Sequence, residues 1–201
     1  MARGHPNGEV RPDRFNPLEP LADVAPSPRL SQVGDTWPLD GRVVGIVAGQ
    51  DIDMIGVDAL RQVILDAGMV PLVIAAAGGV LGGAEPVIVQ RTFATARSVE
   101  FDALVFAGVP GAGADAYGAR DAKAGAPQPP VSDPRVLALL TEAYRHGKAL
   151  VGLGDAGSLF EAAGILVGEP GVVVTDGAQG MRRLTELLAA HRVWERFPAA
   201  V

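Results

Sequence analysis

Short, unbroken apolar runs alternate with stretches of helical spacing from residue 41 onward, and this alternation constrains the fold more than any other feature. A strand inside a parallel sheet is buried on both faces, so its residues are apolar in succession. Five runs have this character and are predicted as core strands: residues 42–48, 70–76, 102–107, 149–153 and 171–175. Strands that alternate with helices predict an α/β fold with a mostly parallel sheet covered on both faces.

Helices are predicted over residues 53–67, from Asp133-Pro134 to Gly147, over a short stretch ending at Ala163, and over residues 179–192. The residues expected on their buried faces are Leu137, Leu140 and Tyr144 in the second helix and Leu184, Leu187, Leu188 and His191 in the last. An extra strand is expected over residues 86–92 and a helical turn over 94–99. The arrangement predicts a three-layer, flavodoxin-like sandwich. A Rossmann-like strand order is the main alternative, because one sequence does not reveal strand order.

The first forty residues are predicted to be an extended arm or linker, followed by one domain over residues 41–201. Seven prolines lie between Pro6 and Pro38. Proline lacks an amide donor and has a fixed φ, which argues against helix or central strand in this region. The few apolar residues of the arm are Phe15, Leu18, Leu21, Leu30 and Trp37. They are expected to lie along another surface, and a disordered tail is the alternative.

The composition excludes several classes of function. The net charge is −6 and no cluster of Lys and Arg occurs, which argues against nucleic-acid binding. The absence of cysteine excludes disulfides, thiolate zinc sites, iron–sulfur clusters and cysteine nucleophiles, and it suits the cytoplasm. The N-terminus lacks the apolar core of a signal peptide, and the apolar runs are too short to span a bilayer. We therefore expect a cytoplasmic protein without membrane contact.

Any small-molecule site is expected where the strands end, at the C-terminal edge of the sheet. That edge should gather residues 49–53, 108–113 and 154–158 together with Asp176. The strand over 149–153 turns into a helix through Gly152, Gly154 and Gly157, which have the spacing G-x-G-x-x-G. Such a turn holds either a nucleophile or a phosphate-binding loop in many α/β proteins.

A nucleophile at this turn is the weaker of the two interpretations. The apex is Gly154 or Asp155, and a carboxylate nucleophile needs an acid or base partner. The only histidines are His5, His146 and His191; the first is in the arm, and the other two lie toward helix C-termini at the opposite edge. Asp155 is therefore interpreted as a helix cap. Ser158 lies outside G-x-S-x-G, and with Glu161 it matches a capping box.

Dinucleotide binding is the alternative for the same glycines. Asp176 follows Gly152 by twenty-four residues, where an acid that binds the ribose is expected. Against this, the unit contains the fourth strand of the domain, the helix is short, and Asp155 would lie beside a phosphate. The loop from Gly108 to Gly113 lacks the Gly-Lys-Ser/Thr of a P-loop. The acids Asp51, Asp53 and Asp115 are interpreted as solvated loop residues, so no metal site is predicted.

Several segments together resemble one known family. They are residues 41–47 (GRVVGIV), residues 91–95 (RTFAT), the Gly-Asp-Ala around Asp155, and residues 189–198 (AAHRVWERFP). The sequence resembles the C-terminal domain of the large-subunit (clade 2) haem catalases, and the terminal His-Arg-Val-Trp motif is fairly specific. Residues 27–31 resemble the linker that joins this domain to the catalase body. The likeness covers about residues 27–198.

The resemblance implies a flavodoxin-like fold of the class I glutamine amidotransferase-like superfamily, in which a cysteine normally occupies the turn. Here Gly154-Asp155 stand there instead. It also implies that haem is bound by an upstream β-barrel body with a distal His and Asn and a proximal Tyr. Tyr117 and Tyr144 fall inside the small domain and are not carried over as haem ligands. We therefore expect no cofactor in this chain, whereas a full-length parent would be a haem catalase that decomposes hydrogen peroxide.

The first functional hypothesis is a non-catalytic accessory domain that supports stability and assembly. Its partner would be the catalase body or another protein surface, contacted through the Pro-rich arm and the large rings of Trp194 and Phe197. Packing of these rings on their own sheet is the alternative. The second hypothesis is a dinucleotide-binding protein that uses Gly152, Gly154, Gly157 and Asp176. A third is a chaperone-like domain that holds unfolded clients. A second copy of the chain, in a homo-oligomer, is a further candidate partner.

Overall fold

The computed structural model describes residues 27, 29–49, 54–81, 86–107, 133–154, 156–175 and 177–197. The chain divides into two units, of which one is formed by residues 1–32 with 198–201 and the other by residues 33–197. The described part of the smaller unit is a turn in which the amides of Leu30 and Ser31 donate to the carbonyl of Ser27. The larger unit contains the sheet and its helices.

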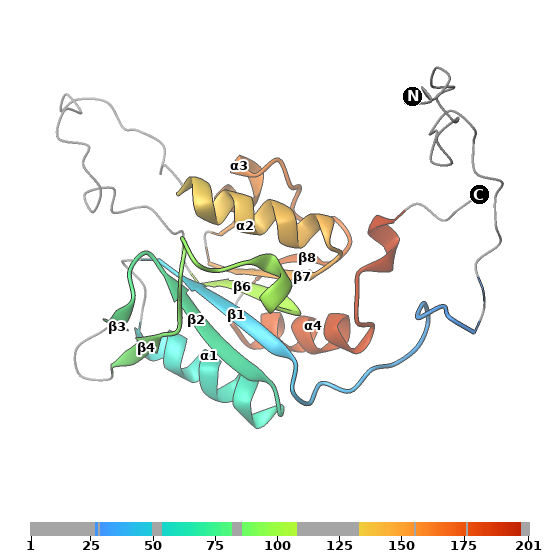
Figure 1. Ribbon diagram of the computed structural model, residues 1–201, viewed down its shortest axis with the longest axis horizontal. Coiled ribbons are helices and arrows are strands. Elements are labelled where there is room, and N and C mark those ends of the chain that lie inside the picture. The colour runs from blue at the N-terminus through green and yellow to red at the C-terminus, as the bar shows by residue number, and fades with distance from the viewer. Residues whose placement is uncertain are drawn as a thin grey trace, which may run out of the picture. The chain divides into compact units, whose positions relative to one another are not determined.

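Each of the five predicted apolar runs forms a strand of the larger unit, and Figure 1 shows all of its strands and helices. The strands are β1 (Val43–Ala48), β2 (Val70–Ala75), β3 (Gly79–Leu81), β4 (Val87–Val89), β5 (Arg91–Thr92), β6 (Ala103–Ala107), β7 (Ala149–Leu153) and β8 (Val172–Thr175). The helices are α1 (Met54–Asp66), α2 (Pro134–Arg145), α3 (Gly157–Ala162) and α4 (Gly177–Ala189), with 3-10 turns η1 (Ser98–Glu100) and η3 (Trp194–Arg196). Asp133 caps α2 as predicted, since its side chain accepts a hydrogen bond from the Arg135 amide at 2.9 Å.

The strand order can be compared with the two predicted topologies. Six strands pair in the order β5-β2-β1-β6-β7-β8, and every pair is parallel. The five predicted core strands therefore follow the order 2-1-3-4-5, which is flavodoxin-like. The α/β, flavodoxin-like prediction is confirmed for these five strands. The two-residue edge strand β5 extends the sheet to the order 3-2-1-4-5-6, which is the order of the Rossmann-like alternative. Because all strands of the main sheet are parallel, their C-terminal ends meet at one edge of the sheet and their N-terminal ends at the opposite edge.

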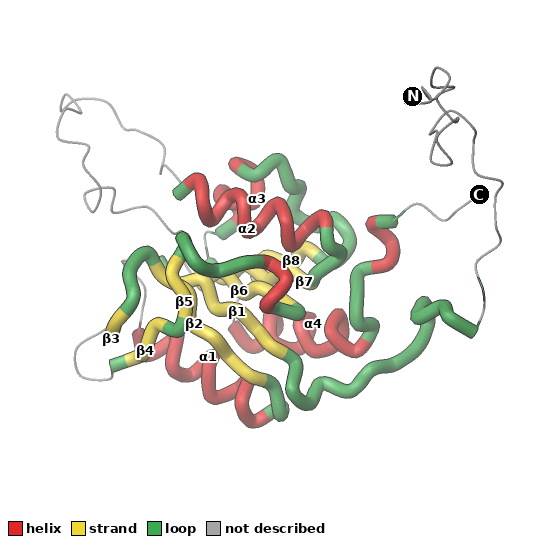
Figure 2. The backbone as a smooth tube through the Cα atoms, viewed as in Figure 1, coloured by secondary structure: helices red, strands yellow, loops and turns green. Residues whose placement is uncertain are grey.

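The region between β2 and β6 is more divided than predicted. The single strand expected over residues 86–92 is two strands, β4 and β5, separated at Gln90. The Gln90 side chain accepts a hydrogen bond from the Val73 amide at 2.7 Å, which holds this break against β2. β4 pairs with β3 in an antiparallel hairpin that lies outside the main sheet, as the tube in Figure 2 shows.

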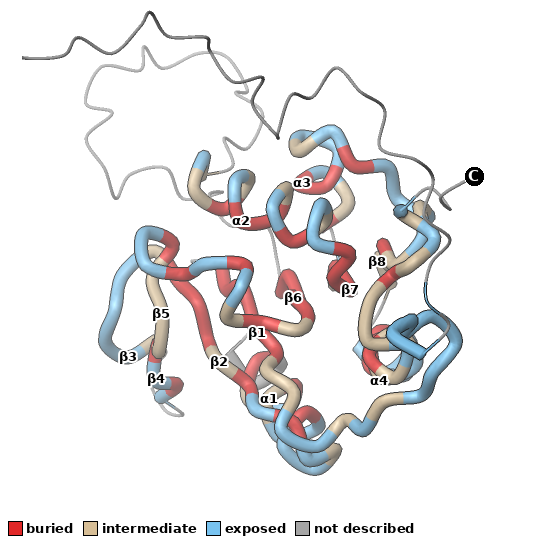
Figure 3. Tube along the Cα trace, turned by 45° about the vertical axis from the view of Figure 1, so that its right-hand side comes forward, coloured by how far each residue is buried: buried red, intermediate tan, exposed pale blue. Residues whose placement is uncertain are grey.

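Helices cover both faces of the sheet, which is the predicted three-layer arrangement. α1 and α4 pack on one face through Leu60, Ile64 and Leu184, while α2 and α3 pack on the other through Leu140 and Phe160. Figure 3 shows that the central strands are buried along nearly their whole length. Among the described residues, no helix is long and apolar enough to cross a membrane.

Two of the predicted helix faces need correction. In α2 the buried residues are Val136, Leu139, Leu140 and Ala143, whereas Leu137 and Tyr144 are only partly buried. Tyr144 stays near the surface because its hydroxyl donates to Glu169, and a phenol with a polar partner is held at the edge of a core. In the last helix Leu184 and Leu188 are buried, but α4 ends at Ala189, so His191 lies beyond it.

Candidate functional site

The predicted site lies at the turn from β7 into α3. Gly154 directly follows β7 and has φ of +63°, a left-handed conformation that favours glycine. Ala156 already has helical dihedral angles, and α3 begins at Gly157. Asp155 and Asp176 lie outside the described residues, as do the predicted site segments at 50–53 and 108–113 and the acid Asp115. The described part of the site is therefore the glycine turn itself.

Close packing explains the first glycine of the turn. A Cβ at Gly152 would lie 2.8 Å from the Ala156 Cβ, 3.0 Å from the Phe160 ring and 3.2 Å from a Val174 methyl. Real side chains do not tolerate the first of these distances without movement, so only glycine lets α3 approach β7 this closely. A Cβ at Gly157 would meet only a Val167 methyl, at 3.8 Å. The spacing thus has a packing cause at Gly152, and dinucleotide binding through these glycines stays a prediction.

The capping box predicted for Ser158 is wrong. Ser158 is the second residue of α3, and the N-cap position belongs to Ala156, which makes no side-chain cap hydrogen bond. The helix begins earlier than expected because Ala156 itself adopts helical angles, with φ of −60° and ψ of −11°. Ser158 therefore lies within the first turn and does not cap the helix.

Both described histidines lie at the opposite edge of the sheet, as predicted. His146 is the C-cap of α2, and His191 follows α4. His146 Nδ1 lies 2.9 Å from the Ser98 hydroxyl, which forms a serine–histidine pair that sequence reasoning missed. Ser98 is only 1% exposed, so no substrate can reach its hydroxyl. The pair fastens η1 to α2. His5 lies outside the described residues.

A network of charged residues occupies this N-terminal edge. Arg42, which precedes β1, donates from Nη1 to Asp102 at 3.0 Å and to His191 Nδ1 at 2.7 Å. Asp102, which precedes β6, also accepts from the Val43 amide at 3.0 Å and lies 3.7 Å from Arg192. Burial raises the pKa of Asp102, but the hydrogen bonds from Val43 and Arg42 and the two nearby arginine charges outweigh burial and lower the pKa. The carboxylate therefore stays ionised across the physiological range.

Lys148 is buried beside this network. Lys148 is only 3% exposed, and its Nζ donates to the backbone carbonyls of Ser98 and Phe101. Burial and the charge of Arg192 lower the pKa of Lys148 to about 8, against the opposing effect of Asp102. Residues that directly precede β1, β6 and β7 thus meet in one polar cluster, which joins three strand ends.

The low pKa of Lys148 predicts a pH-dependent stability. In the folded chain its pKa is about 8, against 10.5 in the unfolded chain, so the unfolded chain binds more protons between these values. Stability contributed by this group therefore rises with pH across that window, by up to about 3 kcal/mol, and is lost again as the pH falls through about 8. Urea unfolding of the unmodified chain and of Lys148→Met, at about pH 8 and at pH 10.5, measures this contribution. A stability difference that stays constant with pH would contradict the assignment.

The C-terminal segment is bound to the same edge by Arg196. Its Nε donates to the Pro170 carbonyl at 2.7 Å, and Nη1 donates to the carbonyls of Tyr144 and Lys148 at 3.0 Å each. The guanidinium also lies 4.3 Å from the centre of the Tyr144 ring. The Val193 amide donates to the Gly147 carbonyl at 2.7 Å. Residues 193–196 thus join the loops that precede β7 and β8.

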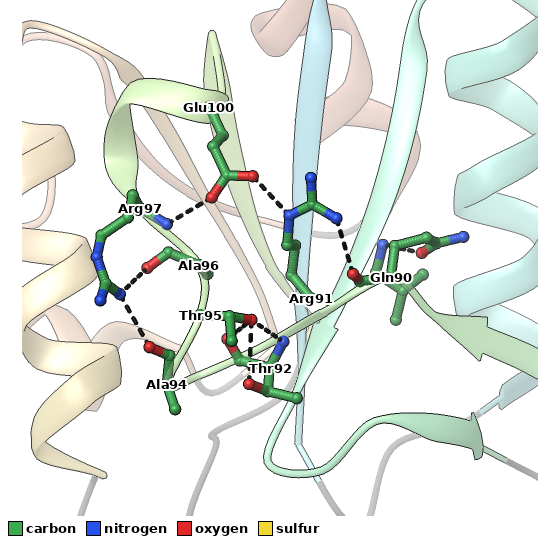
Figure 4. A network of polar contacts seen from close by, with 9 residues as sticks. Gln90, Arg91, Thr92, Ala94, Thr95, Ala96, Arg97 and Glu100 are labelled. Carbon is green, nitrogen blue, oxygen red and sulfur yellow. Dashed lines mark hydrogen bonds and ion pairs between the residues drawn. The ribbon is translucent and has the colours of Figure 1, made fainter.

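The segment 90–100 is a second polar network, drawn in Figure 4. Arg91 Nε donates to Glu100 at 2.5 Å, and the other carboxylate oxygen of Glu100 accepts from the Arg97 amide at 2.9 Å. The hydrogen bond from Arg91 is the main reason why the pKa of Glu100 is lowered. Arg97 donates to the carbonyls of Ala94 and Ala96 at 3.0 and 2.9 Å. These contacts hold the irregular connection between β5 and β6 in place.

Within the described ranges, no cluster of three or more His, Asp or Glu could bind a metal ion.

Comparison with known proteins identifies the family. The family model for the C-terminal domain found in long catalases matches residues 40–198. The chain belongs to this family. Catalase HPII of Pseudomonas aeruginosa is 33% identical to this chain over 193 residues, which cover 90% of this chain and 24% of that protein. The chain thus spans about a quarter of the length of this curated relative.

Membership of the catalase C-terminal domain family confirms the resemblance predicted from the sequence. The terminal motif that carried this resemblance contains His191, Arg192 and Trp194, and the structure places it at the N-terminal edge. Trp194 lies with its ring 6.5 Å from that of His191, and its indole N–H donates to the Ala190 carbonyl at 3.1 Å. The family motif therefore fastens the chain's last described turn to the domain.

Proposed function

We propose that this chain is a non-catalytic accessory domain of a long haem catalase, and that it acts by contact to support the stability and assembly of the parent enzyme. The observation that carries the proposal is the turn from β7 into α3, where the described apex residue Gly154 has no side chain to react and Gly152 serves close packing. Family membership and the placement of His146 and His191 at the far edge support it. A cytoplasmic location, suited to a chain without cysteine, is part of the proposal.

Haem chemistry is assigned to the parent enzyme and not to this chain. Of the two tyrosines, Tyr117 lies outside the described residues. The Tyr144 hydroxyl donates to Glu169 and its ring lies against Arg196, so the residue does not fit the role of an axial haem ligand. Burial beside Glu169 is consistent with this, since the hydrogen bond to that carboxylate raises the pKa of Tyr144 and opposes phenolate formation.

The purified 201-residue chain is expected to show no catalytic turnover and no haem binding. After incubation with haemin and removal of the excess, it should lack a Soret band and should not decompose peroxide. Amidase, esterase and deglycase assays should also give no turnover above that of heat-denatured chain. The proposal fails if a stoichiometric Soret band is lost in Tyr144→Phe, or if measurable turnover is abolished in Asp155→Asn.

Contact with the parent or another protein is proposed to use the exposed aromatic end of the domain. Phe197 is 43% exposed although one edge of its ring covers Gly147, where a Cβ would lie only 2.7 Å away. Trp194 lies 6.3 Å from Phe197 between ring centres. The Phe197 ring thus packs in part on its own domain, and its exposed part belongs to the surface proposed for contact. A chaperone-like action on unfolded clients is the finer form of this proposal, and suppression of aggregation of a heated test protein would support it.

A further inference from the structure

His191 adopts a backbone conformation that suits its side chain poorly. Its φ is +66°, and among the described residues it is the only one other than glycine with a positive φ. Left-handed angles are unfavourable for any residue with a Cβ, and glycine or asparagine is usual just after a helix. A residue with a Cβ held in this conformation points to a role for its side chain.

The contacts of the imidazole determine its protonation state. Arg42 Nη1 lies 2.7 Å from His191 Nδ1. A guanidinium has only donors, so Nδ1 must accept the hydrogen bond. The imidazole is therefore neutral, with its proton on Nε2. A protonated imidazole has donors on both nitrogens and cannot make this contact.

The same imidazole lies against the segment that leads into β1. The Trp37 ring is 5.3 Å from the His191 ring between centres, and the Trp37 amide donates to the Ala189 carbonyl at 2.8 Å. Arg42 also donates from Nε to the Pro38 carbonyl at 3.2 Å. Residues 37–42, which we call the entry segment, thus run past the end of α4, as Figure 2 shows. The indole N–H of Trp37 is buried without an acceptor among the described residues, which makes docking of this side chain less favourable. The Gly41 amide donates to the Gly68 carbonyl at 2.9 Å, so the end of the entry segment next to β1 is held without His191.

The charged groups around His191 disfavour a second positive charge. Arg42 approaches from the start of β1 and Arg192 from the residue after His191, and Lys148 lies beside the same network. The one described carboxylate among these groups, Asp102, already accepts from Arg42 and from the Val43 amide. Burial lowers the pKa of His191, and the charges of Arg192 and Arg42 lower it further against Asp102.

We propose that His191 is a proton-sensitive latch, which holds the Trp37 end of the entry segment against the end of α4 when neutral and releases it when protonated. Protonation replaces an accepted hydrogen bond with repulsion between two cations, so the imidazole moves away from Arg42 and out of its place against the Trp37 ring. The pKa of His191 is lower in the folded chain than the value of 6.5 in the unfolded chain, and this gives the direction of the pH dependence. The contribution of neutral His191 to stability is present above pH 6.5 and is lost as the pH falls through the lower pKa of the folded chain. The strands of the domain do not take part.

Tryptophan fluorescence tests the latch directly, because the chain has only two tryptophans and both lie near His191. The emission of the 201-residue chain is followed from about pH 8 to about pH 5, the range in which histidine titrates. We expect one transition with a midpoint below 6.5. The transition should vanish in His191→Asn, since asparagine tolerates the left-handed angles and does not titrate. It should persist in His146→Asn, the matched control. A transition that survives His191→Asn would overturn the proposal.

Hydrogen exchange separates local release from unfolding and needs no variant. Relative to the intrinsic rate at each pH, the Trp37 amide is expected to exchange about tenfold faster below the transition than above it, the factor that one hydrogen bond to a charged group contributes. The Ile46 amide in β1 should keep its protection at both values. An unchanged Trp37 amide, or equal loss of protection at Ile46, would overturn the latch.

Discussion

Replacing Gly152 by alanine is expected to lower the free energy of unfolding by about 1–3 kcal/mol, the usual result of forcing an extra methyl into a packed core. The new methyl would lie 2.8 Å from the Ala156 Cβ and 3.0 Å from the Phe160 ring, and neither Ala156 nor the buried Phe160 has free space to move into. Urea unfolding followed by circular dichroism measures the change.

Gly157→Ala is the matched control for this turn. It adds the same methyl to the first residue of α3, where the nearest atom would be a Val167 methyl at 3.8 Å. Because alanine has the higher helix propensity, this variant is expected to be about 0.5–1 kcal/mol more stable than the parent chain. Equal effects of the two substitutions would show that packing does not explain Gly152.

Gly171→Ala is expected to have the larger effect, a loss of about 3 kcal/mol that combines overpacking with left-handed strain. Gly171 has φ of +70°, and a Cβ there would lie 2.3 Å from a Val193 methyl and 2.8 Å from Arg196 Nη2. The substitution should therefore displace residues 193–196 from the loops that they join. A shift in Trp194 fluorescence at neutral pH should accompany the lower stability in urea.

Gly168→Ala separates the two causes. Gly168 has φ of +91°, but a Cβ there would meet nothing within 4 Å. Only the conformational cost remains, so a loss of about 1–2 kcal/mol and an unchanged Trp194 emission are expected. If Gly171→Ala were no more destabilising than Gly168→Ala, the C-terminal segment would not be fastened as described.

The core of the fold was predictable because its strands are buried on both faces. The runs that became β1, β2, β6, β7 and β8 are apolar in succession, and the only observed shifts are of a residue or so at their ends. The hairpin of β3 with β4 could not be predicted in this way. Its strands have three residues each, and Val80 and Ile88 are exposed, so neither burial nor alternation marks them clearly.

The N-terminal edge was missed for a different reason. Asp102 lies 60 positions after Arg42 in the chain, and His191 lies 149 positions after it. No local sequence pattern links residues so far apart. One signal was nonetheless available. Arg42, Asp102 and Lys148 each directly precede a predicted apolar strand, and the starts of parallel strands meet at one edge. Charges at three strand starts therefore predict a cluster there.

The two edges of the sheet differ in what their described residues do. At the C-terminal edge, Gly152 allows close packing and Gly154 makes the turn. At the N-terminal edge, Arg42 and Arg196 fasten the entry and the exit of the domain. This division is what the proposed accessory role requires, because a domain that works by contact depends on how firmly its two chain ends are held.

We propose that the domain stabilises a longer enzyme and takes no part in its reaction. The most direct test uses the proposed long catalase that carries this chain, with and without Gly171→Ala. Initial peroxide decomposition per bound haem and the half-life of activity at raised temperature are measured for both. We expect an unchanged initial rate per haem and a shorter half-life in the variant. A lower initial rate per haem with an unchanged half-life would contradict it.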